Sequence, residues 1–206
     1  HECSSAASDV YKRQKLNMKM GQNKISAQEV IKYLTANELD KIFRCFGDEK
    51  YSKIISKKIV KNRKHKEINT EDLVNIINLD KKNYTKKNKS TKVFQALRIL
   101  VNNEIRELII GLSKSCNLIS KNGVIAVVTF HSIEDRICKF FFNEISSVRK
   151  ISRYLPINNT SVVSFNLLKK KPIIPTKTEI EKNPPSRSAK LRAVQKLGIK
   201  KIDTNF

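Results

Sequence analysis

The chain has 206 residues, of which 39% are hydrophobic, so it can bury a core and is not a disordered tail. Its 42 lysines and arginines outnumber its 19 aspartates and glutamates, and the formal charge of +23 favours a polyanionic partner, above all a nucleic acid. A lysine-rich proteome would produce the same excess, so charge alone leaves that alternative open.

The spacing of the cysteines and the length of the apolar runs argue against several classes of protein. The four cysteines lie far apart, without a C-x-x-C pair or a histidine at metal-ligand spacing, which argues against a zinc site and a disulfide framework. They are Cys3, Cys45, Cys116 and Cys138. No stretch approaches the roughly 18 consecutive apolar residues of a membrane helix. We therefore expect a cytoplasmic protein with no metal and no membrane partner.

The first residues differ from the rest of the chain. Residues 1–14, HECSSAASDVYKRQ, are small and polar, do not begin with methionine and lack the apolar segment of a secretory signal. We interpret them as a non-native leader that takes no part in the fold.

Residues 26–88 are predicted to form a small helical subdomain. Ser26 with Glu29, and Thr35 with Glu38, are capping boxes that begin two helices, and Gly47 is expected to end the second. A third apolar stripe follows, and Thr70 is predicted to cap a fourth helix, EDLVNIINL. The third stripe consists of Tyr51, Ile54, Ile55 and Ile59.

A lysine-rich segment, KKNYTKKNKSTK at residues 81–92, comes next and is predicted to be an exposed loop because like charges repel. Its lysines could bind phosphates, and we name Lys86, Lys87 and Lys89 as candidate RNA contacts. A solvated linker is an equally good interpretation.

The longest helical pattern and the most apolar run then follow each other. Apolar residues fall on one face throughout residues 93–115, which predicts one long helix. The run at residues 124–130 does not alternate with polar residues, so we expect a strand that is buried on both faces. A long helix that leads into such a strand is typical of an α/β layer.

Polar residues follow that strand directly. Ser132 and Asp135 stand three residues apart and are predicted to cap the next helix, whose dipole the acidic residues suit. Capping leaves Phe130, His131 and Arg136 unexplained. A lone histidine is more often structural than catalytic, but the carboxyl end of a central strand is where open α/β sheets bind their ligands.

Two late segments are predicted to be strands that pair antiparallel at the end of a mostly parallel sheet. They are SVVSFNLLKKKP at residues 161–172 and SAKLRAVQKL at residues 188–197, and a turn-rich connection with Pro184 and Pro185 joins them. In the second segment, apolar Leu191 and Ala193 alternate with Lys190 and Arg192.

Three separated motifs, in this order, resemble one known family. They are TKVFQALRILVNNE (residues 91–104), VIAVVTFHSIEDRICKFF (124–141) and NPPSRSAKLRAVQK (183–196), and LNMKM at 16–20 resembles the segment where that family enters its helical insertion. The resemblance is to the ribosomal RNA small subunit methyltransferase H family, also called the MraW methyltransferases. It implies an α/β fold, namely the later part of a class I (Rossmann-like) methyltransferase sheet with an inserted small helical subdomain.

The family pattern also has elements that this chain lacks. The glycine-rich cofactor loop and the acidic residue for the ribose precede LNMKM in the family, whereas this chain has five glycines and no G-x-G-x-x-G. We therefore expect residues 15–25 to link to a missing half, residues 89–206 to be the carboxyl-terminal part of the methyltransferase domain, and no cofactor-binding residue in this chain. Asn17 stands where the family usually has aspartate, and Pro185 where it usually has arginine.

The resemblance implies an enzyme that uses S-adenosylmethionine to methylate N4 of a cytidine in 16S ribosomal RNA or the 30S subunit, present here as a fragment that we expect to be inactive alone. We expect Phe130, His131 and Ser132 to line the pocket for the flipped base, with a second layer or helix cap beside them. That second layer comprises Glu134, Asp135 and Arg136. The competing function is a non-catalytic basic RNA-binding or ribosome-associated protein.

A second predicted set of RNA contacts lies near the carboxyl terminus. Hydroxyl and guanidinium donors suit phosphate oxygens, and the segment SRSAKLR supplies Arg187, Ser188, Lys190 and Arg192. An edge strand that is protected by its charges is the alternative interpretation of the same residues.

Overall fold

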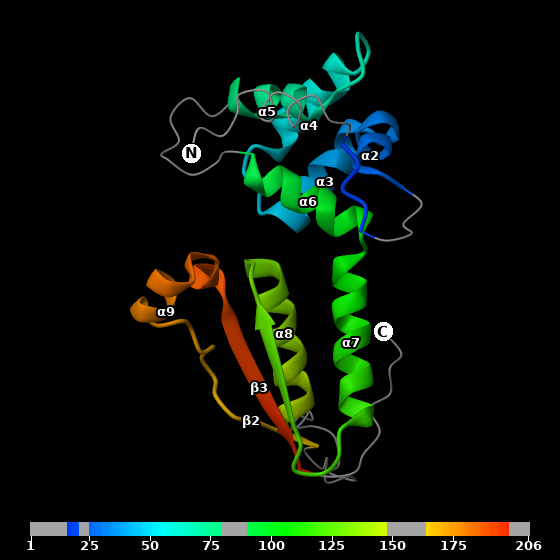
Figure 1. The fold of residues 1–206 in the computed structure, drawn as a ribbon. Helices are drawn as coiled ribbons and strands as arrows, with labels where there is room; N and C mark the ends of the chain where they lie inside the picture. The colour runs from blue at the N-terminus through cyan, green and yellow to red at the C-terminus, as the bar shows by residue number, and fades with distance from the viewer. Residues whose placement is uncertain (1–15, 21–24, 80–89, 148–163, 198–206) are drawn as a thin grey trace, which may run out of the picture. The chain divides into compact units, whose positions relative to one another are not determined.

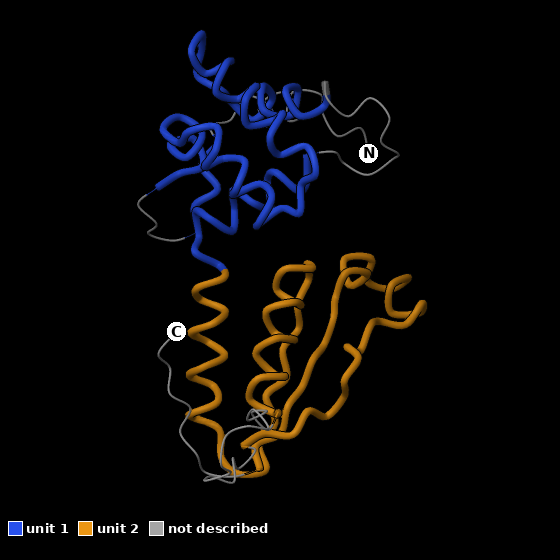
Figure 2. Tube along the Cα trace, turned by 180° about the vertical axis from the view of Figure 1, so that it is seen from behind, with its two compact units in different colours: residues 1–104 blue, residues 105–206 orange. Residues whose placement is uncertain are grey.

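The computed structural model describes residues 16–20, 25–79, 90–147 and 164–197 (Figure 1). The chain divides into two compact units, residues 1–104 and residues 105–206, here called the helical unit and the sheet unit (Figure 2). None of the helices in the described ranges is long and apolar enough to cross a membrane.

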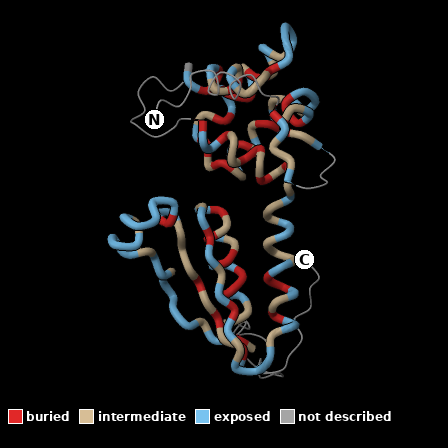
Figure 3. The backbone as a smooth tube through the Cα atoms, viewed as in Figure 1, coloured by how far each residue is buried: buried red, intermediate tan, exposed pale blue. Residues whose placement is uncertain are grey.

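The described part of the helical unit contains five helices around one apolar core. Leu39, Phe43, Ile55, Ile59 and Leu97 are among the side chains that are fully buried in it. Figure 3 shows that buried and exposed positions alternate along these helices. Burial of these stripes supplies the main stabilising free energy of the unit. The helices are α2 (Ala27–Tyr33), α3 (Ala36–Gly47), α4 (Ser52–Asn62), α5 (Thr70–Leu79) and α6 (Thr91–Val101).

Both predicted capping boxes are confirmed. The Ser26 and Thr35 hydroxyls accept hydrogen bonds from the N–H groups of Glu29 and Glu38, whose carboxylates accept in return from the two cap residues. The predicted cap of α5 is wrong by one residue, because Thr70 is already helical. Asn69 caps α5 instead, since its side chain accepts from the Asp72 N–H at 2.8 Å.

Gly47 ends α3 as predicted, and the structure adds a packing reason. A Cβ atom on Gly47 would lie 2.5 Å from the carbonyl oxygen of Lys92, so only glycine lets α3 approach α6 this closely. Asp48 follows in the left-handed conformation, with φ 48°, which stops the helix.

The segment Leu16–Met20 is bound to the helical unit. Leu16 is buried, and the backbone oxygens of Leu16 and Asn17 accept hydrogen bonds from Gln28 and Ala27 at 2.7 and 3.1 Å. Because Asn17 makes this contact through its backbone, the departure from the family pattern at Asn17 leaves it intact.

The single long helix predicted over residues 93–115 is wrong. The structure has α6 (Thr91–Val101) and then α7 (Glu104–Leu118), separated at Asn102 and Asn103. Asn103 has φ 51°, a left-handed conformation that interrupts the helical hydrogen bonds and that asparagine tolerates better than most residues. The apolar periodicity continues across the break, so the pattern gave no sign of it. As a result α6 belongs to the helical unit and not to the later domain, in which residues 89–206 were expected.

Within residues 105–147 and 164–197, the sheet unit has three strands in the order β1-β3-β2, and both pairings are antiparallel. The predicted antiparallel pairing of the two late strands is thus confirmed. A parallel part of the sheet is not among the described residues. The further elements are β1 (Val124–Thr129), α8 (Ser132–Ser146), β2 (Phe165–Leu167), α9 (Lys177–Lys182), the 3-10 helix η1 (Pro184–Ser188) and β3 (Lys190–Lys196).

The prediction that β1 is buried on both faces is also wrong. Ile125 and Thr129 are buried, but Val124 and Val128 are 48% and 52% exposed. Helix α8 contacts all three strands, and its Phe142 is buried with Phe165 and Val194 in the core of the unit. An unbroken apolar run cannot distinguish a strand covered on one face from a strand covered on both.

Candidate functional site

The predicted site lies where β1 ends and α8 begins. Phe130 follows the strand and is 58% exposed, His131 is the N-cap of α8, and Ser132 is its first residue. The predicted cap Ser132 is therefore wrong. The cap is the imidazole of His131, whose Nδ1 accepts a hydrogen bond from the Glu134 N–H at 3.3 Å.

Glu134 organises this turn through its carboxylate. The carboxylate accepts hydrogen bonds from the backbone N–H groups of Phe130 and His131, at 3.0 and 3.4 Å. Burial by itself raises the pKa of Glu134, but the adjacent imidazole of His131 and the Phe130 N–H outweigh this effect and hold the pKa below its ordinary value. Glu134 is therefore an anionic part of the helix cap.

The second nitrogen of His131 is buried and faces the carboxylate of Glu134. Its Nε2 lies 3.1 Å from Oε1 of Glu134, yet it makes no hydrogen bond of acceptable geometry with any described residue. A buried polar atom without such a bond is uncommon, because desolvation costs about 1–3 kcal/mol. His131 is thus held between the Glu134 N–H at Nδ1 and the Glu134 carboxylate at Nε2.

Asp135 joins α8 to β3. Its Oδ1 accepts from Nε of Arg192 at 2.6 Å and its Oδ2 from Nζ of Lys190 at 3.1 Å. Burial alone raises the pKa of Asp135, but the hydrogen bonds from Arg192 and Lys190 lower it below its ordinary value. Asp135 is thus part of a buried ionic link and does not cap the helix.

The alternation of β3 places its charged side chains on the buried face. Arg192, Val194 and Lys196 are buried, whereas Leu191 and Ala193 are only half-buried. Nζ of Lys196 donates to the carbonyl oxygens of Cys116 and Ile119, both at 2.8 Å, near the carboxyl end of α7. A cation at a helix carboxyl terminus is favoured by the unpaired carbonyls there.

The structure of β3 and η1 shows where the second predicted set of RNA contacts, Arg187, Ser188, Lys190 and Arg192, lies. β3 lies between β1 and β2, so the interpretation as a protected edge strand is wrong. Arg192 is 7% exposed and bound to Asp135, which favours a structural role, whereas Arg187 and Ser188 are exposed in η1. Pro185 is exposed in η1 as well. The candidates Lys86, Lys87 and Lys89 lie outside the described residues.

Sequence reasoning missed the link between Asp135 and Arg192 because these residues are 57 positions apart. One local signal existed: Arg192, Val194 and Lys196 share a face of a strand with side-chain period 2. Ser132 and Arg136, the remaining predicted residues of this region, are exposed on the first turn of α8.

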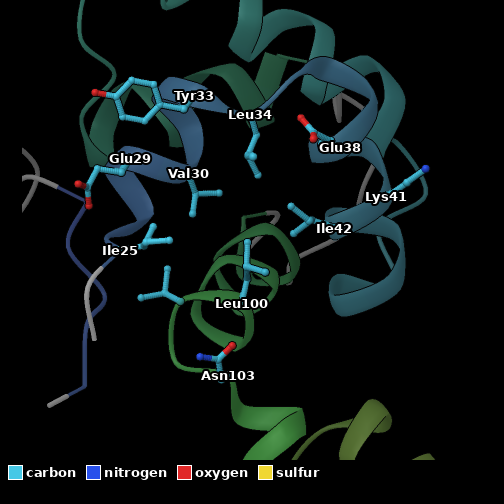
Figure 4. A pocket seen from close by; sticks show the side chains of 11 residues that line it. Ile25, Glu29, Val30, Tyr33, Leu34, Glu38, Lys41, Ile42, Leu100 and Asn103 are labelled. Carbon is cyan, nitrogen blue, oxygen red and sulfur yellow. The ribbon is translucent and has the colours of Figure 1, made fainter. Parts of the chain in front are cut away.

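A large cavity of about 890 Å³ opens in the helical unit, and its lining includes none of the predicted site residues. Val30, Leu34, Ile42 and Leu100 converge on it, and Glu29, Glu38 and Lys41 stand at its rim (Figure 4). Both glutamates are already engaged in capping boxes.

Comparison with known proteins identifies similar sequences along most of the chain. The profile of the MraW methylase family matches residues 10–197. A protein of Caldicellulosiruptor saccharolyticus named ribosomal RNA small subunit methyltransferase H is 40% identical over 188 residues, which are 88% of this chain and 61% of that protein.

Two further relatives carry the same name. The protein of Borreliella afzelii is 44% identical over 178 residues, covering 84% of this chain and 54% of the relative. The protein of Bartonella bacilliformis is 41% identical over 180 residues, which cover 86% of this chain and 54% of that relative. The chain therefore spans little more than half the length of these relatives.

Proposed function

The chain belongs to the MraW methylase family, and we propose that it forms the target-binding part of an enzyme that methylates small-subunit ribosomal RNA with S-adenosylmethionine. The names of the relatives support the reaction class and the RNA substrate in this proposal. N4 of a cytidine is the methyl acceptor that we propose, and the cytoplasm is the proposed location. The non-catalytic alternative is not favoured by these relatives.

The fold of the sheet unit is compatible with the end of a class I methyltransferase sheet. On one side β1 pairs with β3, and no described strand pairs with the other edge of β1. Further strands could extend the sheet from that edge, since an unpaired strand edge offers backbone donors and acceptors. We propose that such strands belong to the rest of the methyltransferase domain.

The described residues do not form a cradle for S-adenosylmethionine. Three glycines are described, and Gly47 and Gly111 lie within helices. Gly123 precedes β1 in a tight turn, where an added Cβ would lie 2.4 Å from the side chain of Ile119. None of them opens a strand-loop-helix turn of the kind that binds a nucleotide cofactor. We therefore propose that this chain alone neither binds the cofactor nor transfers a methyl group.

The contribution that we assign to this chain is to position the base. A cytosine amine is a poor nucleophile because its lone pair is delocalised into the ring, so it must be oriented and desolvated. The exposed ring of Phe130 offers a stacking surface for the base, and the imidazole of His131 adjoins it at the start of α8. The exposed Phe130 ring beside His131, where β1 ends and α8 begins, is the observation that carries this assignment.

The test uses a chimera in which residues 10–197 replace the matching segment of the Caldicellulosiruptor saccharolyticus relative. The chimera should transfer the radioactive methyl group of S-adenosylmethionine to small-subunit ribosomal RNA. A folded chimera that binds the cofactor and transfers nothing would refute the proposal.

Within this chimera, His131→Asn tests the role of the imidazole, since asparagine is a good N-cap and preserves the start of α8. We expect methyl transfer to fall at least tenfold while the melting temperature stays close to that of the parent. Ser115→Ala, on α7, is the control and should change neither quantity. Equal methyl transfer by His131→Asn and the parent would remove His131 from the site.

A further inference from the structure

The outer face of α4 carries a row of exposed lysines. Lys53, Lys57 and Lys61 follow one another at four-residue intervals, and all three are exposed. Ile55 and Ile59, on the opposite face, are fully buried. The helical repeat puts the three lysines on one side of α4, with about 6 Å along the axis between neighbours. We call them the α4 lysine row.

The charges of this row are not balanced within the helix, because α4 contains no acidic residue. Among the described residues, Lys57 and Lys61 make no ion pair or hydrogen bond. Lys53 has one acidic neighbour, Asp40, whose carboxylate already accepts from Ser52 at 2.5 Å and from Arg44 at 3.0 Å. Like charges four residues apart destabilise a helix, so the row opposes the stability of α4.

A basic cavity of about 460 Å³ lies at the carboxyl end of α4. Its lining contains four cations and one acid, and Ile31 and Ile68 contribute apolar surface. Two of the cations are occupied: Arg63 donates to the backbone oxygens of Ile31 and Leu34, and Lys66 pairs with Asp72. Lys32 and Lys64 complete the set, and Lys64 follows Lys61 by three residues. The cavity therefore lies at the end of the helix that carries the row.

We propose that the α4 lysine row binds the sugar–phosphate backbone of a single RNA strand and that the basic cavity at its end holds one further nucleotide. Ammonium groups in regular steps suit successive phosphates, which position a nucleic acid without reading its sequence. The inference rests on the proposed function, because that function makes RNA the partner. It assigns RNA contacts to the helical unit, outside the site at the start of α8.

RNA fits this surface better than an anionic membrane does. A helix that binds a membrane surface needs a broad apolar face turned outward, and the apolar face of α4 is turned into the core. Ile54, at 47% exposure, is the one large apolar side chain of α4 that is exposed.

The experiment measures binding of the 206-residue chain to a fluorescently labelled, unstructured RNA of about 15 nucleotides by anisotropy, between about 50 and 200 mM KCl. The variant is Lys53→Gln/Lys57→Gln/Lys61→Gln. Each lost phosphate contact should reduce the slope of log K against log salt by about 0.7, so the slope should fall by about 2. At about 0.1 M salt, affinity should fall roughly ten- to hundredfold.

The matched control is Lys114→Gln/Lys121→Gln/Lys139→Gln, three exposed lysines of the sheet unit that remove the same total charge. Its slope should stay within about half a unit of that of the parent chain. Circular dichroism checks that both variants are folded, which is expected because glutamine and lysine have similar helix propensity.

Equal slopes for the two variants would overturn the proposal, because RNA binding would then depend on the total charge of the chain and not on the position of the lysines. Absence of RNA binding by the parent chain would overturn it as well. A loss of binding to phosphatidylserine vesicles, with RNA binding unchanged, would assign the row to a membrane instead. None of these outcomes decides methyl transfer by the chimera, so the two proposals can fail separately.

Discussion

The two units use their positive charges in opposite ways. In the described part of the helical unit no lysine or arginine is buried, and the α4 lysine row has little to neutralise it. In the sheet unit, Arg192 and Lys196 are buried and bound to Asp135 and to the end of α7. A net charge of +23 therefore combines cations that are available to a polyanion with cations that hold the fold together.

Asp135→Ala gives the largest effect expected from this comparison. Removal of the carboxylate leaves the guanidinium of Arg192 buried without its counter-charge, which should lower the free energy of unfolding by about 3–5 kcal/mol. Urea unfolding followed by circular dichroism measures the loss, and hydrogen exchange should place it in β3 and α8. Asp135→Ala with Arg192→Met should recover much of it; additive losses in the double variant would show that the two residues do not interact.

Lys196→Met tests the second buried cation. Methionine keeps the apolar stem but leaves the carbonyl oxygens of Cys116 and Ile119 without their charged donor, so a loss of about 2 kcal/mol is expected. Lys121→Met, at an exposed position, should change stability by less than about 0.5 kcal/mol. Equal losses of stability in the two variants would mean that the hydrogen bonds of Lys196 add nothing to the effect of removing one positive charge.

Two glycine substitutions contrast packing in the two units. Gly47→Ala places a Cβ against the Lys92 carbonyl and should destabilise the helical unit by about 1–2 kcal/mol. Gly111→Ala, on α7, meets no atom within 4 Å and should stabilise the sheet unit by about 0.5–1 kcal/mol. Thermal unfolding of both variants checks the signs, and a stable Gly47→Ala protein would show that α3 and α6 can separate at little cost.

Asp135 should contribute to the loss of stability at low pH. Asp135 has a pKa below its ordinary value in the folded state, so its ionic link contributes fully above the unfolded pKa of about 3.9 and is lost as pH falls through the lower folded pKa. Unfolding followed between about pH 6 and pH 2 should thus show a smaller decline for Asp135→Asn than for the parent. An identical decline would assign acid sensitivity to other carboxylates.

The smallest effect concerns the stability of α4. Lys53→Gln/Lys57→Gln/Lys61→Gln removes two like-charge pairs at four-residue spacing and should stabilise the helical unit by roughly 0.2–0.5 kcal/mol per pair at low salt. The gain should disappear at about 1 M salt, where exposed charges are screened. A variant that loses RNA affinity while it gains stability would show that the row serves binding rather than folding.

The sequence by itself determined what depends on hydrogen bonds within about four residues and on local periodicity. The capping boxes at Ser26 and Thr35 and the end of α3 at Gly47 followed from such patterns. The family could also be predicted, because its motifs are contiguous residues.

Only the tertiary structure decided which face of each element is buried and where a continuous apolar pattern breaks. The left-handed turn at Asn103 breaks the helix, although the apolar periodicity of the sequence continues across it. Strand β3 buries Arg192 rather than Leu191 because Asp135 on α8 supplies a counter-charge for Arg192. A partner 57 residues away has no local signature, since its contact exists only after the chain has folded. The physical reason is that a charge prefers water unless a specific counter-charge replaces it, and only the fold supplies that counter-charge.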